Sequence, residues 1–139
     1  MIAKKFEDLM FWQKAREFTK LIYTLTRKDT FKTDFGLKGQ IQRSSVSVMS
    51  NIAEGFGRGG NNEFIQFLFI AKGSLAEVQS QLYVATDLGY IADREFQIAY
   101  GITEEISRLI NAFVKSIKSG GNTSLKKRIR PDPVSDPVL

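Results

Sequence analysis

The sequence predicts an all-α protein, specifically an antiparallel, up-down-up-down four-helix bundle. Apolar residues recur every three or four positions along most of the chain, which is the period of an amphipathic helix. The breaks between these periodic segments are short and rich in glycine, asparagine and aspartate. Short connections favour neighbouring helices that lie side by side and run in opposite directions. The length of 139 residues suits one domain with a real core.

The first helix is expected to end before the segment TRKDTFKTDFG. Its apolar stripe consists of Phe11, Ala15, Phe18, Ile22 and Leu25. Thr33 or Asp34 suits the N-cap of the second helix, because a short polar side chain accepts hydrogen bonds from free backbone amides. The second helix carries one apolar face, formed by Leu37, Ile41, Val48, Ile52 and Phe56. It should end in EGFGRGGNN, a glycine-rich turn.

The third helix is expected to begin near Asn62 and to stop at DLGY, where Gly89 suits the position after a helix C-cap. Its main stripe consists of Phe64, Leu68, Ala71, Leu75, Val78 and Leu82. A second apolar stripe contains Ile65, Phe69, Ala76 and Tyr83. A helix that is apolar on two sides is buried on two sides, and a monomer rarely exposes such a patch. We therefore expect Ile65, Phe69 and Tyr83 to form an oligomer interface.

The fourth helix is expected to have its N-cap at Asp93 and to end at KSGGNTS. Its stripe consists of Ala99, Ile102, Ile106, Leu109 or Ile110, Phe113 and Ile117. The bundle thus occupies residues 1–119. Residues 120–139 contain all three prolines and four basic side chains but no periodicity. They are predicted to form a flexible, disordered tail.

The composition excludes several classes of function. The chain has no cysteine and no histidine, so thiolate catalysis, imidazole bases and zinc sites built on these residues are absent. Carboxylates, lysine, serine or tyrosine leave enzyme chemistry open, but the commonest catalytic side chains are missing. We expect no catalytic residue, metal site or cofactor, and a protein that is not an enzyme. The sequence shows neither a long apolar run nor a signal peptide, which indicates a cytoplasmic protein without a membrane partner.

The positive charge is concentrated toward the N-terminus. The formal net charge is +5, and residues 1–43 contain ten basic against five acidic side chains. Such a bias is compatible with phosphate binding, although a solvated basic surface explains it equally well. The candidates for a nucleic-acid surface, for RNA or DNA, come from the first helix and the loop after it: Lys14, Lys20, Arg27, Lys28, Lys32 and Lys38. Their binding would be electrostatic and independent of base sequence.

A polar ribbon runs along the second helix, opposite its apolar face. On a helical wheel it contains Arg43, Ser47, Ser50, Asn51, Glu54 and Arg58, whereas Ser44 and Ser45 flank the core. The ribbon is interpreted as a surface seam with a Glu54–Arg58 pair, or as a contact with a neighbouring helix or subunit. A catalytic serine is disfavoured because no histidine can activate it.

Three stretches resemble the 23S-rRNA intervening-sequence family: LMFWQKAREFTKLIYTLT, GLKGQIQRSSVSVMSNIAEGFGR and EFIQFLFIAKGSLAEVQSQLYVATDLGYI. The resemblance covers about residues 6 to 118. It implies an up-down four-helix bundle that assembles as a homopentamer, with no catalytic site to transfer. The matching polar residues, which it implies are architectural or interfacial, include Arg43, Asn51, Glu54, Arg58, Ser74 and Glu77. A related branch, the accessory variability protein of diversity-generating retroelements, binds a reverse transcriptase and nucleic acid.

Three functions follow for testing. The first is a non-enzymatic oligomeric bundle that binds nucleic acid or a nucleic-acid-handling protein through its basic surface. The second is a protein-interaction scaffold, such as a reverse-transcriptase accessory protein, with no direct nucleic-acid role. The third is an enzyme, for which Ser74 and Glu77 would be the local polar pair to test.

Overall fold

The computed structural model describes residues 3–119 and confirms the all-α fold. A single 3-10 turn, η1 (Phe6–Asp8), precedes four helices: α1 (Met10–Leu25), α2 (Phe35–Gly57), α3 (Asn61–Asp87) and α4 (Asp93–Lys118). The described part of the chain contains no strand. None of its helices combines the length and hydropathy needed to cross a bilayer. The tail expected over residues 120–139 lies outside the described residues.

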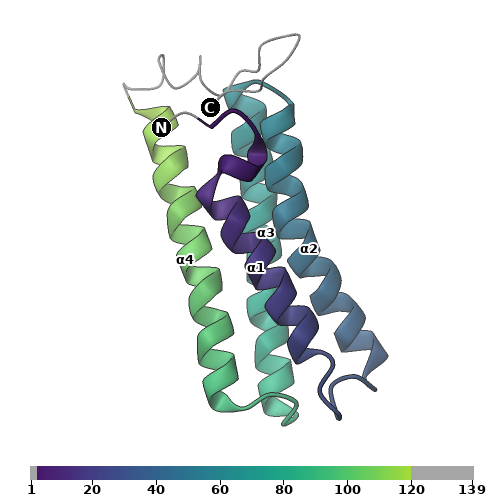
Figure 1. The fold of residues 1–139 in the computed structure, drawn as a ribbon. Helices are drawn as coiled ribbons and strands as arrows, with labels where there is room; N and C mark the ends of the chain where they lie inside the picture. The colour runs from purple at the N-terminus through teal and green to yellow at the C-terminus, as the bar shows by residue number, and fades with distance from the viewer. Residues whose placement is uncertain (1–2, 120–139) are drawn as a thin grey trace.

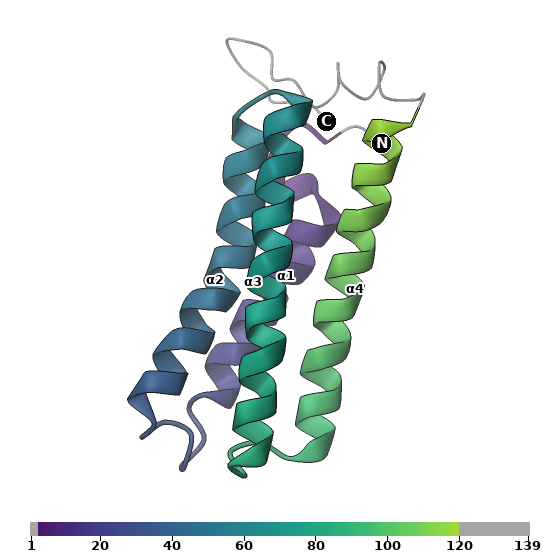
Figure 2. The ribbon, with the colours of Figure 1, turned by 180° about the vertical axis from the view of Figure 1, so that it is seen from behind.

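The four helices form one bundle in which each helix runs opposite to the one before it (Figure 1). Each helix packs against its neighbours in the chain, and α4 closes the bundle against α1. The α2–α3 pair has the most extensive contact. Seen from behind, α3 lies between α2 and α4 (Figure 2), so one side of α3 faces away from the bundle.

The core follows the stripes expected from the sequence. Phe18, Ile52, Leu68 and Ile106 are fully buried, and each comes from a different helix. Of the two alternatives for the buried stripe of α4, Ile110 is fully buried, whereas Leu109 is partly buried beside the core. An edge-to-face chain of aromatic rings, Phe11–Phe113–Phe64, links α1, α4 and α3 near one end of the bundle.

Two of the expected helix ends are confirmed and one is wrong. Asp34 is the N-cap of α2 and accepts a hydrogen bond from the Leu37 amide at 3.1 Å. Gly89 has φ of +76°, and the Tyr90 amide bonds back to the Ala85 carbonyl at 2.8 Å, which closes α3 in a Schellman motif.

Asp93 is the first residue of α4, and its N-cap is Ala92. The expectation fails because Glu95 supplies the cap from the third helical position: its carboxylate accepts the Ala92 amide at 2.8 Å. Asp93 instead lies in the first turn, where a negative charge faces the positive end of the helix dipole.

The loops at the end of the bundle opposite η1 are tied together by side chains. Phe31 is buried and stacks on Tyr90 with 5.1 Å between ring centroids. The Tyr90 hydroxyl donates to the Asp34 carboxylate at 2.9 Å, and this bond raises the pKa of Tyr90. Lys28 pairs with Glu95 across the same end. These contacts join the α1–α2 loop to the α3–α4 loop and the start of α4.

Candidate nucleic-acid interface

Half of the basic residues expected to bind nucleic acid are engaged with carboxylates inside the chain. Lys14 of α1 lies 3.1 Å from Glu105 of α4. Lys28 pairs with Glu95, and this hydrogen bond, together with the Ala92 amide, lowers the pKa of Glu95. Lys32 has a weaker contact with Asp29 at 4.0 Å.

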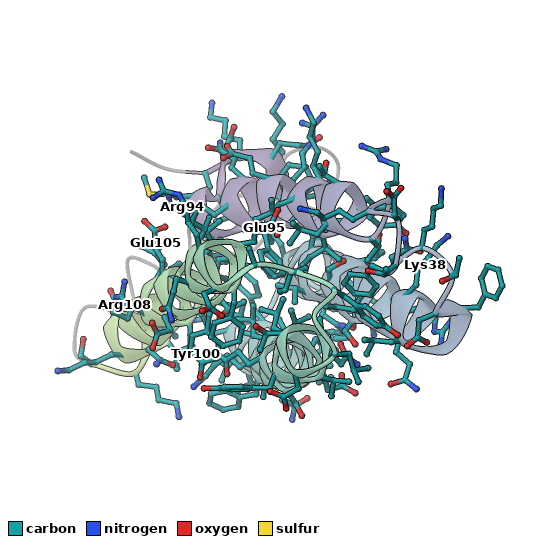
Figure 3. The ribbon with its side chains drawn as sticks, turned by 90° about the horizontal axis from the view of Figure 1, so that it is seen from below. Lys38, Arg94, Glu95, Tyr100, Glu105 and Arg108 are labelled. Carbon is teal, nitrogen blue, oxygen red and sulfur yellow. The ribbon has the colours of Figure 1, made fainter. Side chains whose placement is uncertain are left out.

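The other three candidates have no carboxylate within 4.0 Å among the described residues: Lys20, Arg27 and Lys38. Lys20 borders an open groove of about 530 Å³ on α1, which Glu7 and Glu17 also line. Lys38 belongs to α2, and Figure 3 places it on the side of the bundle away from Arg94 and Arg108 of α4. The expected surface is therefore a set of separated cations interspersed with acids.

The polar ribbon of α2 proves to be a seam that joins α2 to α3. The hydroxyls of Ser47 and Ser74 share a hydrogen bond of 2.8 Å, and Ser74 is almost fully buried. The Asn51 amide donates to both the hydroxyl and the carbonyl of Ser47, at 3.0 and 2.9 Å. Asn51 is half-buried, but both of its hydrogen bonds stay within α2, so the interpretation as a contact between neighbouring helices fits Ser47 and Ser74.

The seam allows the two helices to approach closely. Gly55 is buried, and a Cβ at this position would lie 2.5 Å from the Cβ of Phe67 on α3. Ser44 and Ser45 are buried, as expected of small residues near the core. The Ser45 hydroxyl donates to the Gln42 carbonyl at 2.9 Å, which satisfies it without a partner helix.

The ends of the ribbon are exposed and make different contacts. Glu54 and Arg58 form the expected pair at 2.8 Å, and Arg58 also lies 3.7 Å from Glu63 of α3. The hydrogen bond that Arg58 donates to the Glu54 carboxylate raises the pKa of Arg58. Because both side chains are about half exposed, this pair is a surface contact within the chain.

At the other end, Arg43 and Glu77 line an open groove of about 300 Å³ between α2 and α3. They do not approach within 4.0 Å of each other among the described ion pairs. Beside them, the side-chain amide oxygen of Gln81 is buried without a hydrogen-bond partner in the described chain. The Ser74 hydroxyl faces Ser47, which leaves the Ser74 and Glu77 pair without a shared hydrogen bond. No cluster of acidic residues within residues 3–119 could hold a metal ion.

The second apolar stripe of α3 divides into buried and exposed parts. Ile65 is 8% exposed and belongs to the core of the single chain, so it offers little surface to a second subunit. Phe69 and Tyr83 are 48% and 52% exposed. The sequence reasoning missed three further exposed apolar residues of this helix, Ile70, Val84 and Leu88. A helical wheel that included the positions beside the second stripe could have found them.

The contacts of two exposed aromatic rings, Tyr83 and Phe69, were also not predicted from the sequence. The Tyr83 ring contacts Phe96 and Tyr100 of α4, with centroid distances of 4.9 and 5.8 Å. Partial burial in this cluster raises the pKa of Tyr100. Phe69 lies beside two ammonium groups, those of Lys72 on its own helix and Lys118 on α4. The contact between Lys118 and the Phe69 ring depends on how α3 and α4 pack, so it could not be predicted from the local sequence.

Comparison with known proteins identifies the fold and the family. The family model described as 23S rRNA-intervening sequence protein matches residues 7–112. A crystal structure of a protein of unknown function from the S23 ribosomal protein family of Bacteroides thetaiotaomicron superposes with a TM-score of 0.69 at 25% identity. The match covers 76% of this chain and 99% of that one. No protein in the curated set matches the chain.

Proposed function

The chain belongs to the 23S rRNA-intervening sequence protein family, and from this premise we propose that it is a non-enzymatic, self-associating helical bundle that binds nucleic acid electrostatically. The observation that carries the proposal is the set of cations that have no carboxylate within 4.0 Å among residues 3–119, in a chain with a net charge of +5. A homo-oligomer would multiply this charge over one assembly. Phosphate binding grows with the number of phosphates that are neutralised.

The absence of a catalytic role in this proposal rests on the chemistry of the polar side chains. The hydroxyls of Ser47 and Ser74 share one hydrogen bond, and the Asn51 amide donates to the Ser47 hydroxyl. The Ser45 hydroxyl donates to the Gln42 backbone carbonyl. A serine nucleophile needs an oriented base, and the chain has no histidine to provide one. The seam therefore supports packing between helices, and the basic surface supports binding.

The cations that serve this binding are those whose charge is not already neutralised. Lys14 and Lys28 hold α1 and its following loop against α4, so a phosphate would have to compete with Glu105 and Glu95. Lys20 has no such competitor among the described residues. Because lysine contacts with phosphates carry no sequence information, the binding should tolerate any base sequence.

The test is the fluorescence anisotropy of a labelled single-stranded RNA titrated with the full chain at low and physiological salt. Binding that weakens steeply with salt and does not depend on base sequence supports the proposal. Lack of binding at low salt would remove the nucleic-acid role. Binding unchanged by salt would contradict its electrostatic basis.

A second candidate function, a protein-interaction scaffold, is favoured by the C-terminal part of α3. Tyr83, Val84 and Leu88 lie within two turns of one helix and are 42–56% exposed. Such neighbouring apolar side chains support association with a second copy or with a protein that handles nucleic acid, such as a reverse transcriptase. The pentamer implied by the family resemblance is the assembly that we favour.

Light scattering on the full chain tests self-association against the chain mass of 15.7 kDa. A mass several times larger, reduced by Val84→Glu, supports an interface at this patch. A monomer over a wide concentration range would contradict it. A folded oligomer that binds no RNA would leave the scaffold as the better function.

A further inference from the structure

The exposed ring of Phe69 is flanked by two lysines from different helices. The ammonium nitrogen of Lys72, one turn along α3, lies 5.7 Å from the centroid of the ring. That of Lys118, in the last turn of α4, lies 5.5 Å from the same centroid. The Phe69 side chain is 48% exposed, so part of its surface remains open to a ligand.

Neither lysine has a carboxylate within 4.0 Å among the described residues. The acidic side chain nearest along α3 on the N-terminal side is Glu63, and it lies beside Arg58. Lys115 adds a further positive charge in the last turn of α4. Two like charges thus converge on one ring, an arrangement whose mutual repulsion an anion would relieve.

The net charge of the chain does not explain this arrangement, and neither does helix capping alone. Lys115 and Lys118 stabilise α4 by facing the negative end of its dipole. Lys72 lies in the interior of α3 and has no such role. Phe69 is too exposed to contribute much to the core. A ligand that combines negative charge with a flat apolar surface would use all three side chains at once.

Single-stranded nucleic acid has this combination. Each unpaired base offers a flat face that stacks on an aromatic ring, and each phosphate offers a negative charge to a nearby cation. A duplex hides its base faces, so it could use the lysines but not the ring. Burial of Phe69 against another protein subunit would remove two ammonium groups from water, which is costly unless that subunit supplies carboxylates.

We propose that Phe69, Lys72 and Lys118 form a binding site for single-stranded nucleic acid, in which a base stacks on Phe69 and the two lysines bind the flanking phosphates. The inference rests on the proposed function and assigns it a site distinct from α1. It also moves Phe69 from the expected oligomer interface to the nucleic-acid surface.

The experiment measures the anisotropy of a labelled oligouridylate of about twelve nucleotides, a length within the usual footprint of such sites, against full-length variants. Phe69→Leu keeps an apolar side chain but removes the aromatic face, and is expected to weaken binding about fivefold or more, as loss of one stacked base does. The double variant Lys72→Gln and Lys118→Gln is expected to flatten the slope of log affinity against log salt by about 1.4, for two lost contacts.

Phe35 provides a matched control within the same chain. It is 76% exposed, and Lys38 lies 5.8 Å from its centroid at the same three-residue spacing as Lys72 from Phe69. Within residues 3–119, no cation from another helix lies over the Phe35 ring. Phe35→Leu should therefore leave binding close to that of the wild type.

The outcomes separate this inference from the proposed function. Wild-type binding that persists unchanged in the Phe69→Leu variant and the double lysine variant overturns the site but keeps nucleic-acid binding. Absence of wild-type binding overturns both. Circular dichroism and light scattering on every variant check folding and assembly: a Phe69→Leu variant that loses self-association and not RNA binding would return Phe69 to the subunit interface and refute the inference.

Discussion

A methyl group added at Gly55 tests how closely α2 and α3 approach each other at this position. The new Cβ would lie 2.5 Å from the Phe67 Cβ and 3.0 Å from the Phe64 Cδ1. Carbon atoms in ordinary contact are about 3.5–4.0 Å apart, so roughly 1 Å must be gained. The Phe67 Cβ is bonded to the α3 backbone, and rotation of its side chain cannot move it. In Gly55→Ala the two helices must therefore separate.

The expected loss follows from three contributions. Overpacking of a well-packed contact costs about 1–3 kcal/mol. Separation of the helices also stretches the 2.8 Å bond between Ser47 and Ser74, and a hydrogen bond of this kind is worth about 0.5–1.5 kcal/mol. Alanine offsets about 1 kcal/mol of this loss, because it is the better helix former. The net decrease in the free energy of unfolding is expected to be about 1–3 kcal/mol.

Urea denaturation followed by far-UV circular dichroism measures this decrease, with all variants at one protein concentration because self-association would stabilise the folded state. Gly101→Ala is the control: Gly101 lies inside α4, and no atom lies within 4 Å of its added Cβ. It should gain about 0.5–1 kcal/mol from helix propensity. If Gly55→Ala were as stable as the wild type, the close approach of α2 and α3 would be refuted.

Three further predictions concern polar contacts. Glu95→Gln should lower the free energy of unfolding near neutral pH but not in acid. Lys28 depresses the pKa of Glu95, so the stability that this carboxylate contributes is lost as the pH falls below the unfolded pKa of about 4.3. Equal losses at both pH values in urea titrations would contradict this. Ser74→Ala should lower it by about 0.5–1.5 kcal/mol through the lost bond to Ser47. Glu54→Ala, in an exposed pair, should change it less, and a larger effect in the assembled protein would place Glu54 in a subunit interface.

The elements of this fold were predictable because each is encoded by local signals. Asp34 caps α2 through a bond to the amide three residues on, and Gly89 ends α3 with a positive φ. Both effects act within one turn of helix, so the sequence shows them directly. The predicted N-cap of α4, Asp93, was wrong because two acidic residues lie near the start of this helix. Only the geometry shows that Glu95 accepts the amide of the N-cap residue, Ala92.

The candidate site was less predictable because it depends on contacts between helices. The sequence showed Lys14 and Lys28 as basic residues of α1 and its loop, but their acidic partners lie on α4. Ile65 falls on the second stripe of α3, and only tertiary packing shows that the bundle covers it. The sequence did identify the small and polar residues of the α2–α3 seam, but not which partner each would bind.

The distribution of these ion pairs gives salt two separable effects on the protein. Lys14–Glu105 and Lys28–Glu95 join α1 and its loop to α4. They are partly exposed, so salt screens them, and their small contribution to stability changes little. Lysines without carboxylate partners can bind a strand only by displacing its counterions, and that binding falls steeply with salt. The proposed binding therefore predicts a range of salt concentrations in which the bundle remains folded while nucleic acid dissociates from it.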